Sequence, residues 1–259
     1  MDKKYFFFDI DGTLTDRQTG KVVPSAKLAL RKLQENGHFV AIATGRAHYK
    51  SIQFMREVGL VNMVCNGGNG PVIDGQLVEN SPLDRKKSIA LCRQAKSLGY
   101  GILIAKDDSK DVYANNDLFL QQVGLRKEPT RYIINRTLQY EDIKEFYKIY
   151  IAIPSNEEFK LTLKDTLGNL RFIEEYLMFQ ADDKKHGIER MIEKVDGTME
   201  EVVVFGDDYN DLVMFDSRWY SIAMGNACIE LKQKANYITK DNTEDGIYKV
   251  CVEKGWIIE

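Results

Sequence analysis

Two carboxylates stand directly behind a run of four aromatic residues near the start of the chain. The run is Tyr5–Phe8, and Asp9 and Asp11 follow it. A run without polar alternation is typical of a strand that is covered on both faces, as in a parallel sheet between helices. Residues two apart in an extended segment project to the same side, so both carboxylates are expected to face one point. Two anions this close need a cation or a proton between them, and Mg²⁺ prefers oxygen ligands. The stretch therefore predicts a Mg²⁺ site at a strand end, with an ordinary Asp-Gly turn as the alternative.

A second apolar run also ends in a cluster of carboxylates. Val202–Phe205 is followed by Gly-Asp-Asp-Tyr-Asn-Asp, which places carboxylates at Asp207, Asp208 and Asp211. A parallel sheet can set the ends of two strands side by side even when they are far apart in the sequence. One bound Mg²⁺ would account for both acidic loops, whereas a purely structural explanation needs two coincidences.

Two further segments carry groups that could hold an anion. Thr44, Gly45 and Arg46 come directly after another apolar strand. A hydroxyl and free amides before a helix can bind a phosphate, although Thr is equally favoured as a helix cap. Lys184 stands at the start of an amphipathic helix, where the helix dipole does not favour a cation. We expect Lys184 either to have an anionic partner or to be solvated.

The order of the predicted elements indicates a doubly wound α/β fold with an insertion. The strand Tyr5–Phe8, a helix after Pro24 and the strand Phe39–Ala43 form a strand-helix-strand unit. In such folds, ligands bind beyond the carboxyl ends of the strands. We therefore predict a mostly parallel, Rossmann-like core sheet formed by residues 1–83 and 182–259. Residues 84–181 are predicted to form an inserted α+β unit, which carries no obvious catalytic constellation.

Within the insertion, helices are expected at four places and strands at five. The expected helices are Arg85–Leu98, Asp117–Val123, Tyr140–Phe146 and Asn156–Leu163. The expected strands are Gly101–Ala105, Asp111–Asn115, Ile149–Ile153, Leu170–Glu174 and Tyr176–Phe179.

Composition argues against several classes of partner. The 259 residues are 44% hydrophobic and carry a formal net charge of −3, which speaks against binding to nucleic acid or to an anionic membrane surface. No segment approaches the ~18 uninterrupted apolar residues of a membrane span. The cysteines and histidines are scattered, so neither a zinc site nor a disulfide framework is expected. We expect a soluble, cytoplasmic protein with free thiols that is a monomer or a small homo-oligomer.

Taken together, the motifs resemble those of the haloacid dehalogenase-like superfamily of phosphatases, and within it the Cof-type subfamily. Residues 9–13 match the first motif D-x-D-G-T, residues 43–46 match the second, and residues 206–211 match the fourth, G-D-x-x-N-D. The segment Ala223–Ala227 is similar to one that usually follows the fourth motif. The third motif departs from the common K-G-x-G/A, because it reads Lys-Lys-His-Gly from Lys184 onward. Alignment on Gly187 selects Lys184, with Lys185 as the alternative.

The resemblance implies a role for each matched residue. It implies that Asp9 is the nucleophile, that Asp11 is the general acid and then the base, and that the reaction passes through an aspartyl-phosphate. The implied cofactor is Mg²⁺, with ligands from Asp9, the Asp11 backbone carbonyl, Asp207 and Asp211. The groups implied to bind the phosphate are Thr44, Lys184, Arg46, Asn210 and the amides near Ile10 and Gly45.

The resemblance also implies that the inserted unit, residues 84–181, is a cap that determines the substrate. A small phosphorylated metabolite, such as a sugar phosphate or a cofactor phosphate, is the expected substrate. A phosphomutase on the same scaffold and a non-catalytic protein that binds a phosphorylated ligand are the alternatives. Dehalogenase chemistry is disfavoured, because hydrolytic dehalogenation needs no acid-base group at Asp11.

Overall fold

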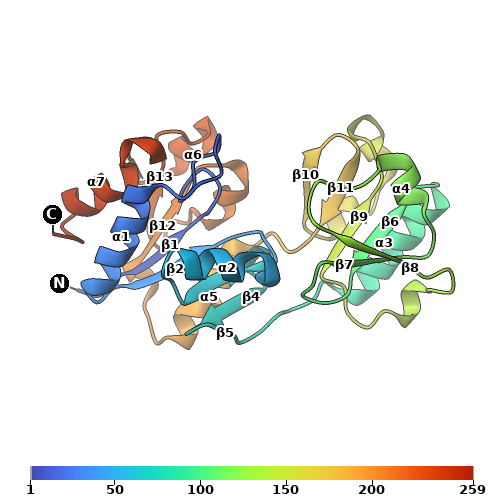
Figure 1. The fold of residues 1–259 in the computed structure, drawn as a ribbon, viewed down its shortest axis with the longest axis horizontal. Helices are drawn as coiled ribbons and strands as arrows, with labels where there is room; N and C mark the ends of the chain where they lie inside the picture. The colour runs from blue at the N-terminus through green and yellow to red at the C-terminus, as the bar shows by residue number, and fades with distance from the viewer. Residues whose placement is uncertain (1, 259) are drawn as a thin grey trace. The chain divides into compact units, whose positions relative to one another are not determined.

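The computed structural model describes residues 2–258 and divides them into two compact units (Figure 1). One unit, here called the core unit, holds the described residues up to Asn80 and from Asp183 onward. The other, here called the inserted unit, is Ser81–Asp182. Within residues 2–258, no helix is both long enough and apolar enough to cross a membrane.

The core unit is built on an eight-stranded sheet with the strand order β14-β13-β12-β1-β2-β3-β4-β5. Every neighbouring pair from β14 to β3 is parallel, and only the β3–β4 and β4–β5 pairs are antiparallel. The strands are β1 (Tyr5–Phe8), β2 (Phe39–Ala43), β3 (Asn62–Cys65), β4 (Gly70–Ile73), β5 (Gln76–Leu77), β12 (Val202–Gly206), β13 (Tyr220–Ala223) and β14 (Tyr237–Ile238). The helices are α1 (Pro24–Glu35), α2 (His48–Glu57), α5 (Lys184–Lys194), α6 (Ile229–Lys234) and α7 (Gly246–Glu253).

Helices cover both faces of this sheet, which explains the unbroken aromatic run in β1. Phe6 and Phe8 pack into an apolar cluster with side chains of α1, α2 and α7. Tyr5 and Phe7 point to the opposite face and pack with side chains of α5 and α6. All four rings are therefore buried although they alternate between faces. The predicted doubly wound α/β fold with a mostly parallel sheet is confirmed.

The central strands end side by side. Phe8 of β1 is paired with Phe205 of β12 on one side and with Ile42 of β2 on the other. Because these pairs are parallel, the residues that follow the three strands leave the sheet at the same edge. The two acidic loops, which are nearly two hundred residues apart in the chain, are therefore neighbours.

The inserted unit contains a six-stranded sheet with the order β10-β11-β9-β6-β7-β8, in which only the β7–β8 pair is parallel. Its strands are β6 (Ile102–Ala105), β7 (Asp111–Ala114), β8 (Arg131–Ile134), β9 (Lys148–Ile151), β10 (Asn169–Ile173) and β11 (Tyr176–Phe179). Its helices are α3 (Arg85–Ser97) and α4 (Leu118–Val123). Apolar clusters lie on both faces of this sheet as well.

Two helix predictions for the inserted unit are wrong, and one of its strands was missed. The helix predicted at Tyr140–Phe146 is a single 3₁₀ turn, Tyr140–Asp142, and the one predicted at Asn156–Leu163 is a 3₁₀ segment, Ser155–Lys160. Isolated segments of this length do not nucleate an α-helix well, and packing of their apolar residues does not require one. The strand β8 was not predicted, because its pattern of exposure lacks a buried run.

One loop of the core unit holds both ends of the insertion. This loop is the 3₁₀ turn η1 (Asn66–Gly68), which follows β3. Asn66 Nδ2 donates to Asn80 Oδ1 at 2.6 Å, and the Asp183 amide donates to the Gly67 carbonyl at 2.7 Å. Gly68 has a φ of +110°, and a Cβ at this position would overlap the Asp183 carbonyl. The chain therefore leaves and rejoins the core unit at the same turn.

Candidate active site

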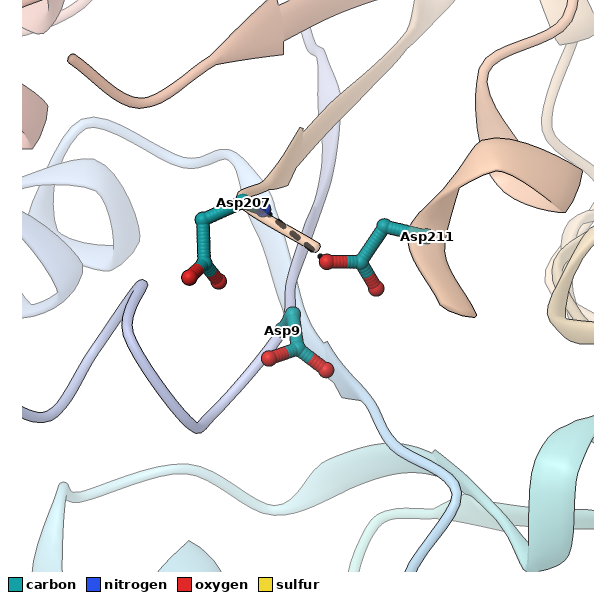
Figure 2. Close-up of side chains that lie close together, drawn as sticks. All are labelled: Asp9, Asp207 and Asp211. Atoms are coloured by element: carbon teal, nitrogen blue, oxygen red, sulfur yellow. Dashed lines mark hydrogen bonds between the residues drawn. The ribbon is translucent and has the colours of Figure 1, made fainter. Parts of the chain in front are cut away.

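Three buried carboxylates meet where the central strands end (Figure 2). Asp9 directly follows β1, Asp207 directly follows β12, and Asp211 lies in the 3₁₀ segment η6 (Tyr209–Met214). One carboxylate oxygen from each lies within 4.8 Å of the other two. The parallel register of β1 and β12 brings the first two together, and the turn into η6 returns the third.

Lys184 joins two of these carboxylates. It is the first residue of α5, and its side chain is only 1% exposed. Its Nζ donates to Asp9 Oδ1 at 2.7 Å and to Asp211 Oδ1 at 2.6 Å. Lys185 instead forms an ion pair with Asp216 at 2.7 Å and is partly exposed. Of the two lysines considered from the sequence, Lys184 is thus the one that belongs to the carboxylate cluster.

Burial and mutual repulsion shift the protonation of the cluster. Burial, helped by the Asp211 carboxylate and opposed by Lys184, raises the pKa of Asp9 to about 8. Burial and the Asp211 carboxylate likewise raise the pKa of Asp207 to about 6. Burial by itself would lower the pKa of the Lys184 ammonium, but the attraction of Asp211 and Asp9 outweighs it and raises that pKa. The ammonium therefore stays charged among anions that repel one another.

The second oxygen of Asp211 shapes the loop that carries Asp207. Asp211 Oδ2 accepts the amide of Asp207 at 2.9 Å and the amide of Asp208 at 3.2 Å. Asp208 in turn caps the start of η6, so that the two residues form a capping box. Gly206 is required beside them, because a Cβ at this position would lie 2.8 Å from the Asp211 side chain. Both oxygens of Asp211 are thus engaged, one by Lys184 and one by the backbone.

Asp207 has three donors, none of which was assigned to the site from the sequence. Its Oδ1 accepts the Thr13 hydroxyl at 2.9 Å. Its Oδ2 lies 2.6 Å from Arg17 Nη2 and 3.4 Å from Asn226 Nδ2. Thr13 and Asn226 fall inside matched motifs, which could have singled them out. Arg17 lies outside every motif, and no signal in the sequence pointed to it.

The side chain of Asp11 lies apart from this cluster, contrary to the prediction that it faces the same point as Asp9. Its carboxylate is 63% exposed and forms a two-point ion pair with Arg46, in which Arg46 Nε lies 3.1 Å from Asp11 Oδ2. Alternation of side chains requires an extended backbone, but the strand ends at Phe8. The Ile10 carbonyl then accepts the amides of Leu14 at 3.0 Å and Thr15 at 2.9 Å, so Asp11 lies inside a turn and no longer in an extended segment.

The turn after β2 is positioned by Thr44. Thr44 is buried, its hydroxyl accepts the Arg46 amide at 3.1 Å, and its own amide donates to Val64 at 2.8 Å. The alternative that Thr44 caps the following helix is wrong, because the N-cap of α2 is Ala47. The remaining predicted phosphate contacts are Ile10, Gly45 and Asn210. Gly45, beside Thr44, and Asn210, at the second position of η6, are both half-buried. Ile10 itself is fully buried.

The donor set of the cluster suits a hard divalent cation. Its ligand atoms are all carboxylate oxygens, which Mg²⁺ and Ca²⁺ prefer over softer metals. The three buried carboxylates outnumber their two cations, the buried Lys184 ammonium and the partly exposed Arg17 guanidinium, so the cluster can take up a further cation. The residues present therefore fit a metal such as Mg²⁺.

Comparison with known proteins gives consistent results over almost the entire chain. The sequence profile of the haloacid dehalogenase-like hydrolases matches residues 6–251. A Bacillus subtilis (strain 168) protein named "Putative phosphatase YkrA" is 31% identical over 259 residues, covering 98% of this chain and 99% of the relative. The pyridoxal phosphate phosphatase YbhA of Escherichia coli (strain K12) is 26% identical, covering 95% and 97%. A crystal structure of a protein from Geobacillus kaustophilus HTA426 matches with a TM-score of 0.82 and 28% identity, covering 99% and 100%.

Proposed function

Because this chain belongs to the haloacid dehalogenase-like hydrolase family and is a phosphatase of that family, we propose that it is a Mg²⁺-dependent enzyme that hydrolyses a small phosphorylated metabolite through a phosphorylated Asp9. The observation that carries this proposal is the buried Lys184 ammonium between Asp9 and Asp211, with Asp207 alongside. A lysine and a metal cation at one carboxylate are suited to accept a phosphate group, whose own negative charge would otherwise repel the nucleophile.

Asp9 is the nucleophile in this mechanism. One of its carboxylate oxygens forms a bond to phosphorus while the bond between phosphorus and the ester oxygen breaks. Asp11 gives a proton to the departing alcohol. Asp11 then takes a proton from water, whose oxygen bonds to phosphorus as the bond between phosphorus and the Asp9 oxygen breaks, which releases phosphate and restores the Asp9 carboxylate. General acid-base assistance of this kind is worth about 10²–10⁴ in rate.

The proposed metal ligands are carboxylate oxygens of Asp9 and Asp207, supported by Asp211, together with the backbone carbonyl of Asp11. A bound Mg²⁺ supplies neutralising charge for the phosphate oxygens. Asp211 acts mainly by holding Lys184 and the amide of Asp207 in place, because both its oxygens are engaged there. The nucleophile, the ammonium and the second acidic loop are thereby fixed to one another before substrate arrives.

The proposed phosphate contacts come from three loops. The Thr44 hydroxyl, the amides near Ile10 and Gly45 and the Lys184 ammonium bind the phosphate oxygens, with Asn210 beside them. Arg46 differs from the others, because its guanidinium contacts Asp11. We assign Arg46 the role of orienting the Asp11 carboxylate for proton transfer, in addition to its charge near the phosphate.

Substrate choice is assigned to the inserted unit, Ser81–Asp182. Phosphate chemistry is common to all phosphomonoesters, so the groups that distinguish one metabolite from another must recognise the rest of the molecule. Pyridoxal phosphate, the substrate that names the relative YbhA, is a cofactor phosphate and belongs in any test panel alongside sugar phosphates.

The test is release of inorganic phosphate from a panel of phosphorylated metabolites and one chromogenic phosphomonoester, with Mg²⁺ and with a chelator. We expect release that requires Mg²⁺ and that Asp11→Asn reduces by about 10²–10⁴. No release from any compound would overturn the proposal and favour a non-catalytic phosphate-binding protein. Turnover that depends on a sugar bisphosphate and moves phosphate to a second hydroxyl would identify a phosphomutase instead.

A further inference from the structure

Arg17 places a second cation on the carboxylate cluster. It lies in the loop between β1 and α1, outside the family motifs. Its Nη2 lies 2.6 Å from Asp207 Oδ2 and 2.8 Å from Asp208 Oδ2. The Arg17 side chain is 49% exposed, whereas the Asp207 side chain is fully buried. Arg17 thus reaches from solvent to a buried carboxylate that we propose as a metal ligand.

The local backbone leaves space for this contact. Gly12 has a φ of +92°, and a Cβ at this position would overlap both Asp207 Oδ2 and Arg17 Nε. The loop itself is ordered by Asp16, which accepts the Gln18 amide at 2.9 Å and the Thr19 hydroxyl at 2.8 Å. The guanidinium therefore lies against a glycine, at the end of a loop with its own hydrogen bonds.

Of the three donors to Asp207, Arg17 is the one that can leave at low cost. Thr13 is fully buried, so its hydroxyl has no solvent to turn to. Asn226 is fixed by two other bonds, from its Nδ2 to the Gly12 carbonyl at 2.8 Å and from the Asn242 amide to its Oδ1 at 3.0 Å. Arg17 is partly solvated and, on leaving Asp207, still has the exposed Asp208 as a partner.

We propose that Arg17 is an internal counter-ion that competes with Mg²⁺ for Asp207 and thereby sets the affinity of the metal site. The inference rests on the proposed function, since it assumes that the carboxylate cluster binds Mg²⁺. A guanidinium stays protonated at all relevant pH values. Competition therefore depends on the position of Arg17 and on ionic strength, and Arg17 weakens Mg²⁺ binding wherever it contacts Asp207.

The test is the Mg²⁺ dissociation constant of the full chain, measured by titration calorimetry at low and at high salt. We expect Arg17→Gln to bind Mg²⁺ on the order of tenfold more tightly at low salt, because a unit charge a few ångströms from the site is removed. The gain should shrink at high salt, since the Arg17 side chain is half-exposed and screened. Arg17→Lys keeps the charge, so its Mg²⁺ dissociation constant should lie between those of the wild type and Arg17→Gln. Arg31→Gln, which removes an exposed arginine paired with Glu35 on α1, should leave the constant unchanged.

Thermal unfolding adds a second readout. Without Mg²⁺, Arg17→Gln should melt below the wild type because Asp207 loses a partner, and saturating Mg²⁺ should stabilise the variant by more than it stabilises the wild type. If Arg17→Gln binds Mg²⁺ no more tightly than the wild type, the proposed role of Arg17 is overturned, while the proposed metal site stands. Absence of Mg²⁺ binding in the wild type would overturn the metal site, and with it both proposals.

Discussion

The two sheets of this protein distribute their charged side chains in different ways. In the core unit, the parallel strands β1 and β12 end at one edge, and the residues behind them converge on a buried cluster. In the inserted unit, every neighbouring pair except β7–β8 is antiparallel, so the residues that follow most neighbouring strands leave the sheet at opposite edges. Within residues 2–258, the one group of three carboxylates spaced for a metal lies in the core unit. Strand direction thus decides where charges can be concentrated.

Ion pairs in the inserted unit have a different character. Asp111 pairs with Arg131, with Nε 2.7 Å from Oδ1, and Glu158 pairs with Lys164 and Arg171 at 2.9 Å each. Each of these anions has at least one dedicated cation. The Asp9 cluster holds three carboxylates but only two cations, Lys184 and Arg17. We infer that the paired ions of the inserted unit maintain its fold, whereas the Asp9 cluster is suited to binding a further cation and a phosphate.

The largest expected effect comes from exchanging one carboxylate in each unit. Asp9→Asn removes the proposed nucleophile and should lower kcat by about 10⁴-fold or more. Asp111→Asn alters an equally buried carboxylate of the inserted unit and should change kcat by less than about twofold, since it breaks an ion pair whose arginine is largely exposed. Phosphate release under saturating substrate measures both. A comparable loss in the two variants would break the contrast between the units.

A smaller effect should separate two adjacent lysines. Lys184→Met removes the ammonium between Asp9 and Asp211, and we expect kcat to fall by about 10²–10³, the value typical of a lost charge-stabilising donor. Lys185→Met removes only a partly exposed ion pair with Asp216 and should retain nearly full activity. Circular dichroism shows whether both variants fold. Equal activities would mean that the buried ammonium serves the fold alone.

Packing in the inserted unit should affect stability. Phe119 of α4 is buried against the sheet, and Phe119→Ala should lower the free energy of unfolding by about 3–5 kcal/mol. Phe172 on the edge strand β10 is 69% exposed. Phe172→Ala should therefore change the free energy of unfolding by less than about 0.5 kcal/mol. Urea titration of each variant measures the difference. Similar losses for the two rings would show that the edge strand is covered in solution.

The smallest effect is a pH dependence in the core unit. His38 is buried, its Nδ1 accepts the Lys4 amide at 3.1 Å, and its Nε2 faces the Trp256 carbonyl at 3.2 Å. Burial lowers the pKa of His38 below its usual 6.5, although the hydrogen bond to the Trp256 carbonyl favours the charged ring. Neutral His38 therefore favours the folded state. This contribution to the free energy of unfolding is fully present above pH 6.5 and is lost as the pH falls from there through the folded-state pKa.

His38→Gln removes this titration. The free energy of unfolding of the wild type should fall more than that of the variant between about pH 7.5 and pH 5.5. Urea unfolding at the two pH values gives the comparison. Parallel losses in both proteins would assign the acid sensitivity to other groups.

The core unit could be predicted from the sequence because its strands are buried on both faces. The run at Tyr5–Phe8 favours a strand covered on both faces, since it is short, lacks polar alternation and consists of aromatic residues, which are enriched in strands. In the inserted unit, β8 has mixed exposure and sits at a sheet edge. Its assignment depends on which strand lies next to it, and local sequence does not carry that information.

The candidate site was predictable in its members but not in all of its contacts. The motifs identified Asp9 and Asp207, which each follow a buried strand, and they narrowed the lysine at the helix start to Lys184 or Lys185. The orientation of Asp11 could not be predicted, since it depends on where the backbone ceases to be extended. Arg17 could not be predicted either, because a long flexible side chain reaches its partner through space and leaves no periodic pattern.

The turn η1 (Asn66–Gly68) has a consequence for the engineering of the chain. Since Asn80 and Asp183 are both bonded to this turn, the two junctions of Ser81–Asp182 are anchored without help from the residues between them. A short glycine-serine bridge could join them without disturbing β3 or α5. The inserted unit between these junctions is therefore a segment that can be removed or replaced as a whole. A designer could therefore graft a different segment between these junctions and leave the carboxylate cluster of the core unit unaltered.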